Sequence, residues 1–586
     1  STIATTFTPS NDGTLQLGDS PNDTLTFNGG INEGTSGTVT LFGSIVSSND
    51  AITFGAFALG ANTTITSAGG AISVGAIGGS LGEDITITSS GGGTNTVTTN
   101  GTIGAGGNIN TVAITGATSV TLGGNIATND APGNTVTVTG STVDFNGITI
   151  NTNNTNNDGN VTVNVDTFPD SVTVNAGTGI MQMTPVTTNA VIEAARTNSG
   201  NISEGVFYDV DLVNVTNASH VLIGSSSHTG NIFWGNDSAA LALSTAGNVV
   251  LQNSSSGQIL LSSDYNSGGG FLTLTSGNGV TLQDLSANGQ ATINLGAGAL
   301  TVTGAVTLAD NTIDITANGG ISFSSTIDAD DAGSNDRSLI MNAGTGGAIA
   351  VTGNIGGGSG LAGLTITQSN GATFSGNVNV NDVNGGGGTI TITDTENGAD
   401  IVFAGSVVAK ALDLAQQGYD LIFNGGATFT DAVTFDNTGI LTLGNASGDT
   451  FTFNGGLTET TSGNVTLAST INSSNDAISF GAVTLGANTT IDTNASSNAA
   501  DITLGAVTGG NNTLTLTTEN NITGADVTAS GAIAGVTTLT LASVGGTATL
   551  SADVDVTTLS VNNTVANVVF TGNGSSVVNA VAFAND

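Results

Sequence analysis

The carboxylates best placed for chemistry lie in one short stretch of the sequence. Asp328, Asp330 and Asp331 precede Arg337 in the segment DADDAGSNDR. Grouped carboxylate oxygens are the ligands that Ca²⁺ prefers, and a carboxylate pair is what glycoside cleavage requires. These three Asp residues are therefore the predicted metal ligands, with Ca²⁺ as the candidate ion and no cofactor required. The acidity of the whole chain favours the alternative that the stretch is a solvated loop.

The remaining residues give little support for catalysis. His220 and His228 are the only histidines and the chain has no cysteine, so a zinc site is not expected. We expect both histidines to be surface residues on neighbouring strands. Because no serine stands in a nucleophile motif with a plausible histidine partner, we predict no catalytic residues and a protein that is not an enzyme.

One section of the chain departs from the rest in composition. Residues 180–240 collect most of the unusual side chains, and we interpret them as a decorated or irregular section. Tyr208, Phe233 and Trp234 could stack on sugars there and are the predicted glycan-binding residues, although such side chains also pack beneath loops. Ala190 to Arg196 (AVIEAAR) has the one convincing helix composition of the chain.

Charge excludes several classes of partner. Three basic residues, Arg196, Arg337 and Lys410, face 43 acidic ones, for a formal net charge of −40. Nucleic acids and anionic membrane surfaces are bound by Lys and Arg, so neither is an expected partner. No apolar run has the length of a transmembrane helix, so we expect no membrane insertion. Divalent cations would relieve the self-repulsion and are expected partners.

Short alternating segments make up the rest of the chain. Apolar residues alternate with Thr and Ser, as in Leu25 and Phe27, and Gly or Asn ends each run. A Phe, a small residue and Gly recur together, and Phe403 and Phe423 are spaced by about 20 residues. Residues 13–66 and 439–492 are a duplicated module, with roughly two-thirds of their positions identical.

This pattern predicts an all-β parallel β-helix, or β-solenoid, with roughly 20–30 residues per coil. We expect residues 1–586 to form a single continuous solenoid, an elongated rod with Phe, Ile, Val and Leu stacked inside. Gly and Asn would supply the corners, and Asn side chains at equivalent corners would form ladders. Both ends of the sequence still read as ordinary coil, so we expect either that another copy covers each end or that the chain is a piece of a longer solenoid.

Several runs resemble a known group of proteins. Val120 to Ile126 (VTLGGNI), Gly230 to Ile232 (GNI) and Leu272 to Leu282 (LTLTSGNGVTL) are similar to the repeats of filamentous-haemagglutinin-type exoproteins and autotransporter passengers. These are secreted β-helical surface proteins of bacteria. The resemblance implies a right-handed parallel β-helix, export to the cell surface, and a role in adhesion or in an extracellular matrix such as that of a biofilm.

The leading functional expectation is an extracellular structural solenoid that assembles end to end into a surface fibre, sheath or matrix. Its main partner would then be a second copy of itself, joined head to tail. One alternative is an adhesin stalk that binds a glycan or a host or neighbouring cell surface through residues 180–240. A second alternative is a polysaccharide-active enzyme of the β-helix type.

Overall fold

The computed structural model describes residues 1–34, 37–80, 82–105, 109–167, 171–194, 205–208, 213–235, 247–284, 289–330, 337–381, 387–459, 461–519, 522–581 and 583. In these ranges every regular element is a β-strand, and they form about 22 turns of a parallel β-solenoid without α-helices. This confirms the predicted fold class. The described residues accordingly contain no helix able to cross a membrane. The chain divides into two compact units, Ser1–Val280 and Thr281–Asp586.

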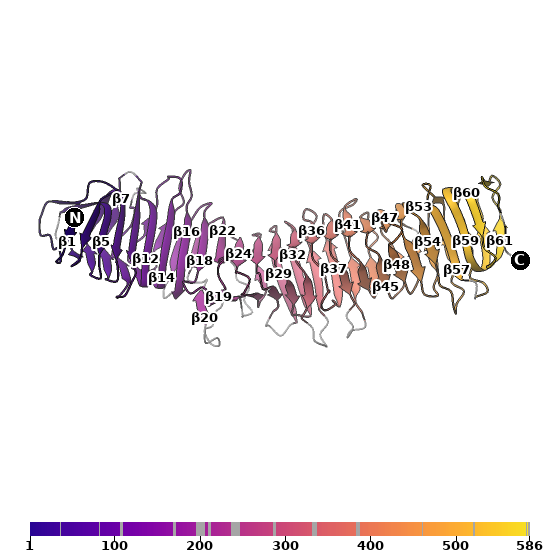
Figure 1. Cartoon of the computed structure of the whole chain (residues 1–586), viewed down its shortest axis with the longest axis horizontal. Helices are drawn as coiled ribbons and strands as arrows, with labels where there is room; N and C mark the ends of the chain where they lie inside the picture. The colour runs from indigo at the N-terminus through magenta and orange to yellow at the C-terminus, as the bar shows by residue number, and fades with distance from the viewer. Residues whose placement is uncertain are drawn as a thin grey trace. The chain divides into compact units, whose positions relative to one another are not determined.

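In the second unit a coil is built from three short strands. One coil contains β44 (Asp420–Phe423), β45 (Ala427–Phe429) and β46 (Val433–Phe435), and the next contains β47 (Ile440–Leu443), β48 (Thr450–Phe453) and β49 (Leu457–Glu459). Each strand pairs in parallel with its equivalent on the next coil (Figure 1), so that Leu421 lies opposite Leu441. A longer coil separates Ala372 from its partner Ile401. Both separations fall within the predicted period.

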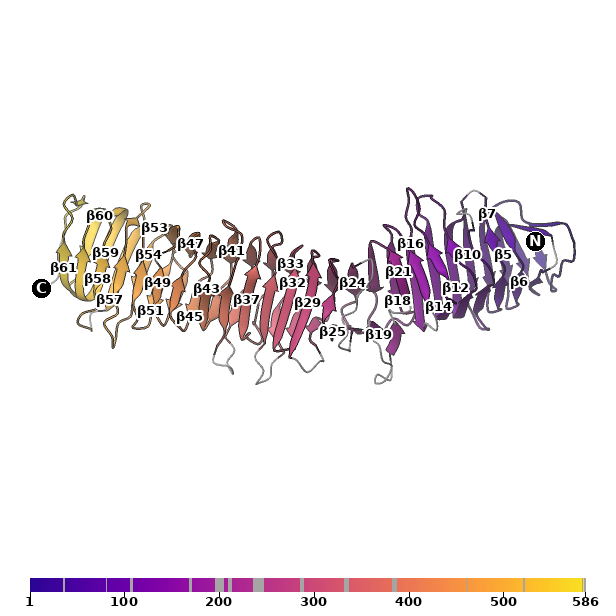
Figure 2. The same ribbon diagram turned by 180° about the vertical axis from the view of Figure 1, so that it is seen from behind.

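In the first unit one long ladder can be followed through six coils. It consists of β7 (Phe57–Ser67), β10 (Glu83–Ser89), β12 (Ile109–Leu122), β14 (Thr135–Asp144), β16 (Asn160–Thr167) and β18 (Ile180–Thr184). Figure 2 shows β10, β12, β14, β16 and β18 stacked in order.

The regular spacing changes after this ladder. Ile180 lies opposite His220, a longer step along the chain than between the preceding coils, because two extra strands form between them. These are β19 (Val191–Ala194) and β20 (Gly205–Tyr208), which pair with each other. The helix expected for Ala190–Arg196 is wrong over β19, where pairing with β20 and with β23 (Ile232–Trp234) outweighs local helix propensity. Residues 195–204, 209–212 and 236–246 of this region lie outside the described residues.

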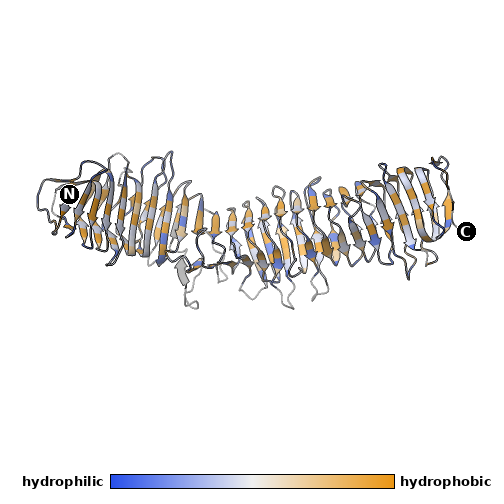
Figure 3. Cartoon of the chain, in the orientation of Figure 1, coloured by the Kyte–Doolittle hydropathy of each residue, from blue (hydrophilic) through white to orange (hydrophobic). Residues whose placement is uncertain are grey.

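The interior is filled by columns of apolar side chains. Along most of the described strands hydrophobic and hydrophilic residues alternate (Figure 3), and the inward set is almost completely buried. The rings of Phe374, Phe403 and Phe423 stack from coil to coil, with centroids 5.0 and 4.9 Å apart. The glycine two residues after each Phe is explained by packing, because a Cβ on Gly405 would lie 2.5 Å from the backbone of Gly376.

Corners between strands depend on glycine and asparagine, as predicted. Six non-glycine residues in the described ranges have positive φ, and five of them are asparagines. Asparagine side chains also link successive coils. The Oδ1 atom of Asn354 accepts the backbone N–H of Asn377 at 2.9 Å, and Oδ1 of Asn377 accepts that of Ser406 at 3.0 Å. The ladder therefore joins side chains to the backbone of the next coil.

The strands of the duplicated module have equivalents in both copies, although β5 (Thr38–Ser47) of the first copy is divided into β50 (Asn464–Leu467) and β51 (Thr470–Ser473) in the second. In the first copy β2 (Thr14–Leu17), β3 (Thr24–Phe27) and β6 (Ile52–Phe54) correspond to β47, β48 and β52 (Ile478–Phe480) in the second. Both copies place a glutamate among the interior residues, since Glu33 and Glu459 are each 1% exposed. Oε2 of each carboxylate accepts a backbone N–H from the next coil at 3.3 Å, from Gly55 and Gly481 respectively. A buried carboxylate is tolerated here because backbone donors satisfy it.

Truncation of one ring should test the Phe column. We expect Phe423→Ala to destabilise the second unit by about 3–5 kcal/mol, because it leaves a cavity between stacked coils. The measurement is urea unfolding followed by circular dichroism. Phe570→Ala is the matched control, since Phe570 in β61 (Val565–Phe570) is 38% exposed, and its effect should be clearly smaller. If both variants lost the same free energy of unfolding, the Phe column would contribute no more to stability than an exposed ring does.

Candidate functional site

The predicted carboxylate cluster lies in the second unit, at one corner of the solenoid. Asp328 is on β34 (Ile327–Ala329), which pairs with β31 (Val306–Leu308) on the preceding coil. Alternation along β34 directs Ile327 and Ala329 inward and leaves Asp328 and Asp330 toward solvent. The strand therefore places two of the three predicted carboxylates on the same outer side, and Asp331 lies outside the described residues.

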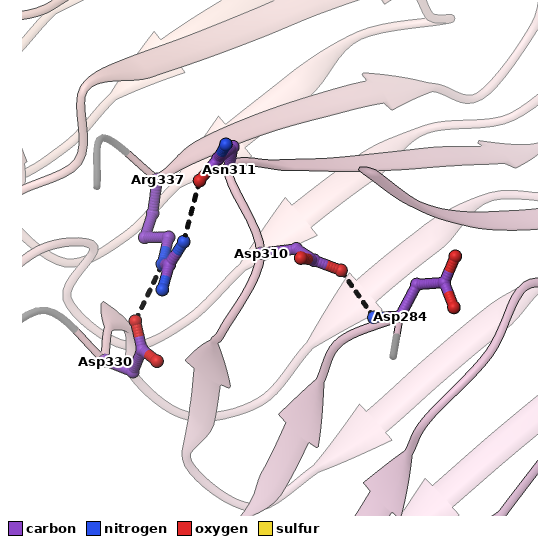
Figure 4. A network of polar contacts seen from close by, with 5 residues as sticks. All are labelled: Asp284, Asp310, Asn311, Asp330 and Arg337. Carbon is purple, nitrogen blue, oxygen red and sulfur yellow. Dashed lines mark hydrogen bonds and ion pairs between the residues drawn. The ribbon is translucent and has the colours of Figure 1, made fainter. Parts of the chain in front are cut away.

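The two carboxylates bind different partners. Oδ1 of Asp328 accepts the backbone N–H of Gly358 on the next coil at 2.7 Å. Asp330 instead forms an ion pair with Arg337, whose Nε lies 2.7 Å from Oδ1 of Asp330. Arg337 also donates from Nη1 to Oδ1 of Asn311 at 3.0 Å, and its side chain is only 11% exposed. Figure 4 shows the guanidinium between Asp330 and Asn311.

A second carboxylate pair lies beside this arginine. Oδ2 of Asp310 accepts the backbone N–H of Asp284 at 2.5 Å (Figure 4). Asp310 is 9% exposed. Burial raises the pKa of Asp310 above its usual value, and the negative charges of Asp284 and Asp330 add to this effect. The hydrogen bond from Asp284 and the charge of Arg337 oppose the rise.

This arrangement uses its charges mainly for structure. Asp330 is neutralised by Arg337, and Asp328 and Asp310 hold backbone N–H groups, so the oxygens do not converge on one point. In the part of the chain that the structure describes, no three His, Asp or Glu side chains are grouped so as to hold a metal ion. The Ca²⁺ prediction for Asp328, Asp330 and Asp331 stays a prediction.

The sequence interpretation missed Asp284, Asp310 and Asn311 as members of this corner. A usable signal was present, because Asp284 and Asp310 have the same separation along the sequence as Asn311 and Arg337. That separation is one coil, and residues one coil apart lie side by side in a solenoid. Reading the cluster across coils would have found these partners.

The predicted aromatic and histidine residues lie in the first unit. Trp234 is 1% exposed and its ring centroid is 5.5 Å from that of Tyr265, so it packs inside the solenoid. Phe233 alternates to the outer side of β23 and is half-buried, and the side chain of Tyr208 lies outside the described residues. Glycan binding by this set stays a prediction.

The expectation of surface histidines is wrong for His228, which is 1% exposed. Burial lowers the pKa of His228 and of His220, because desolvation disfavours the charged imidazole. His220 is half-buried and lies against Phe271, with ring centroids 6.0 Å apart. The sequence contained no sign of this difference, since His228 closes a turn with Ser225 in the irregular section.

Other carboxylates act as links between coils. Asp158 accepts the backbone N–H of Thr178 on the next coil at 2.7 Å and that of Asn154 at 2.9 Å. These hydrogen bonds, first the one from Thr178, lower the pKa of Asp158 because they stabilise the ionised form. Asp130 is held in the same way by the backbone of Asn156 and Asn157, which also lowers its pKa.

Comparisons with known proteins give no relative: no protein-family model, no curated protein and no solved structure matches the chain.

Asp310→Asn should raise the thermal stability of the second unit near neutral pH. The amide oxygen can still accept the N–H of Asp284, whereas the cost of a buried charge is removed. A raised pKa in the folded state means that the wild type gains stability as the pH falls, so the advantage of the variant should shrink toward acid. Melting temperatures of both proteins across about pH 3 to 8 measure this. A pH-independent difference would contradict it.

Asp158→Asn should change the pH dependence of stability in the opposite sense to Asp310→Asn. A carboxylate whose pKa is lowered by folding stabilises the protein above its unfolded pKa, about 3.9, and loses this contribution as the pH falls through the folded pKa. The variant keeps an oxygen acceptor without the charge, so its first unit should lose less stability than the wild type below about pH 4. The measurement is hydrogen exchange of the coil around Thr178 at several pH values. If Asp158 does not stabilise this coil through its charge, the wild type and the variant will show the same pH dependence of exchange.

Proposed function

We propose that this protein is a non-enzymatic structural solenoid of the extracellular space, which assembles end to end into a fibre, sheath or matrix. The observation that carries the proposal is the use of side chains for stacking on successive coils of the described residues. Inward residues form columns, and the Asn and Asp residues at the corners are linked to the backbone of the next coil. Such a design provides stiffness and durability along the coil axis.

The small number of basic residues supports the proposal that the protein forms a durable material. Trypsin cleaves after Lys and Arg, and the chain has three of these, Arg196, Arg337 and Lys410. The guanidinium of Arg337 is nearly buried in its contacts with Asp330 and Asn311. Secretion and a bacterial surface location rest on the resemblance to filamentous-haemagglutinin-type exoproteins and form part of this proposal.

Assembly through the coil edges is supported by the last coils of the second unit. Val569, Phe570, Val578 and Phe583 are 41%, 38%, 76% and 54% exposed, whereas Leu550 and Val561, which lie opposite Phe570 and Phe583 on the preceding coil, are buried. Exposed apolar side chains favour contact with another polypeptide. We take a second copy of the chain, added head to tail, as the partner, with divalent cations reducing the repulsion between two chains of net charge −40.

The alternatives have weaker support. A glycan-binding adhesin would present its aromatic rings to solvent, and Trp234 is instead buried against Tyr265. A polysaccharide-active enzyme would need carboxylates free to act on sugar, and Asp330 and Asp310 are held by Arg337 and by the backbone of Asp284.

Electron microscopy of the native protein tests the proposal directly. We expect continuous fibres in the presence of millimolar Ca²⁺ or Mg²⁺, and fewer or shorter ones after chelation, because the cations screen the acidic surfaces. Val578→Asp/Phe583→Asp should reduce fibre length without changing the circular dichroism spectrum. Thr434→Asp/Thr458→Asp, on exposed positions of β46 and β49, adds the same charge away from the apolar group and is the control. Single particles under every condition would contradict the proposal.

A further inference from the structure

One outer face of the first unit carries a regular array of threonines. Strands β7, β10, β12 and β14 are in register, so their outward side chains form two parallel ranks. We call this array the threonine panel; its members are Thr64, Thr86, Ala113 and Thr137 in one rank and Thr66, Thr88, Thr115 and Thr139 in the other. All of these positions except Ala113 are threonine, over four successive coils.

The panel is held rigidly from beneath. Its members are half-buried on the outer side of the sheet, and they alternate with inward residues such as Ile65, Ile87 and Ile114 that are 0% exposed. Branching at Cβ restricts χ1 of threonine, so each side chain has few orientations. Consecutive strands of the panel pair with one another, and Figure 2 shows β7, β10, β12 and β14 in the same part of the solenoid. The hydroxyl and methyl groups are thus positioned before any ligand binds.

The panel is also uncharged in a protein with 43 acidic residues. The nearest outward acid on these strands, Asp84, lies at the border, where it accepts the N–H of Thr111 at 3.1 Å and binds the side chain of Asn62 at 3.1 Å. No aromatic side chain belongs to the panel, so it lacks the stacking groups that sugars favour. An uncharged, non-aromatic surface fits an uncharged ligand that offers hydrogen bonds in a regular pattern.

Other hydroxyl ranks in the protein differ from this panel. In the second unit Thr515, Thr540 and Ser560 lie beside a second uncharged rank, Thr513, Thr538 and Thr558, but this pair of ranks extends over three coils. On the adjacent face of the first unit, the rank of Thr98 and Thr121 ends at Asp144. Of these three surfaces, the threonine panel has the longest pair of adjacent uncharged ranks.

The spacing of the panel points to the ligand. Parallel strands are about 4.8 Å apart, and alternate residues of one strand are about 6.6 Å apart, so the panel is a rectangular net of hydroxyls with these repeats. Water oxygens on the faces of ice repeat over similar distances in two dimensions. We propose that the threonine panel binds ice, with its hydroxyls replacing surface water molecules and its methyl groups lying in the hollows between them.

Ice itself is the probe for the test. The full-length protein should show thermal hysteresis and faceted crystals in a nanolitre osmometer. Thr66→Tyr/Thr88→Tyr, one coil apart in one rank, should abolish the hysteresis because the rings lift the ice surface from the panel. Tyr is favourable in strands, so the variant should keep the wild-type circular dichroism spectrum and melting temperature.

The matched control is Thr98→Tyr/Thr121→Tyr, which changes two half-buried threonines, also one coil apart, on the adjacent face. We expect this variant to keep full hysteresis. Absence of hysteresis in the wild type would overturn the proposal, as would an equal loss in both variants. A third result would also overturn the proposal: the wild type sediments with crystalline cellulose, the panel variant does not, and neither protein affects ice growth. The ligand would then be a neutral polysaccharide.

Discussion

Parallel hydrogen bonding between successive coils is the constraint on which the other features depend. Each strand must lie in register with its equivalent about 4.8 Å away, so any residue is flanked by the residues one coil before and one coil after it. A Phe such as Phe403 therefore meets other Phe rings, and a glycine such as Gly405 meets another glycine. Sequence choices that would be independent in a globular protein become linked along a column.

The same constraint makes the acidity difficult to accommodate. Register places Asp400 directly beside Asp420, where like charges oppose stacking. The chain offsets this by using carboxylates as acceptors for the next coil, as Asp420 does for the N–H of Ile440 at 2.7 Å. Asp158 and Asp328 do the same. Much of the negative charge thus takes part in holding coils together, in addition to favouring solubility.

The features predictable from the sequence were those that repeat. Alternation of apolar and hydroxyl residues, the Phe and Gly signature and the regular spacing of Phe403 and Phe423 were enough to predict a parallel solenoid. Asparagine at the corners followed from its tolerance of positive φ. These signals succeeded because local strand propensity and coil packing favour the same residues.

Features that occur once could not be predicted in this way. Val191–Ala194 has the composition of a helix but forms a strand, because β20 and β23 offer backbone partners that the local sequence does not reveal. His228 is buried although it closes a turn in the same irregular section. The partners of Arg337 come from separate coils, so a reading confined to the segment around it found Asp330 and missed Asn311.

The matching strand plans of residues 13–66 and 439–492 bear on how such a protein can change in length. The duplicated stretch contains two whole coils, since Thr14 lies opposite Thr38 and Val39 lies opposite Phe57. Insertion of whole coils preserves the register of everything on either side. The polar group inside the stretch travels with its own donors, as Glu33 does with Gly55 and Glu459 with Gly481. Copying of gene segments can therefore lengthen or shorten the molecule without redesign of its interior, and natural variants that differ by an integral number of coils would be equally able to fold.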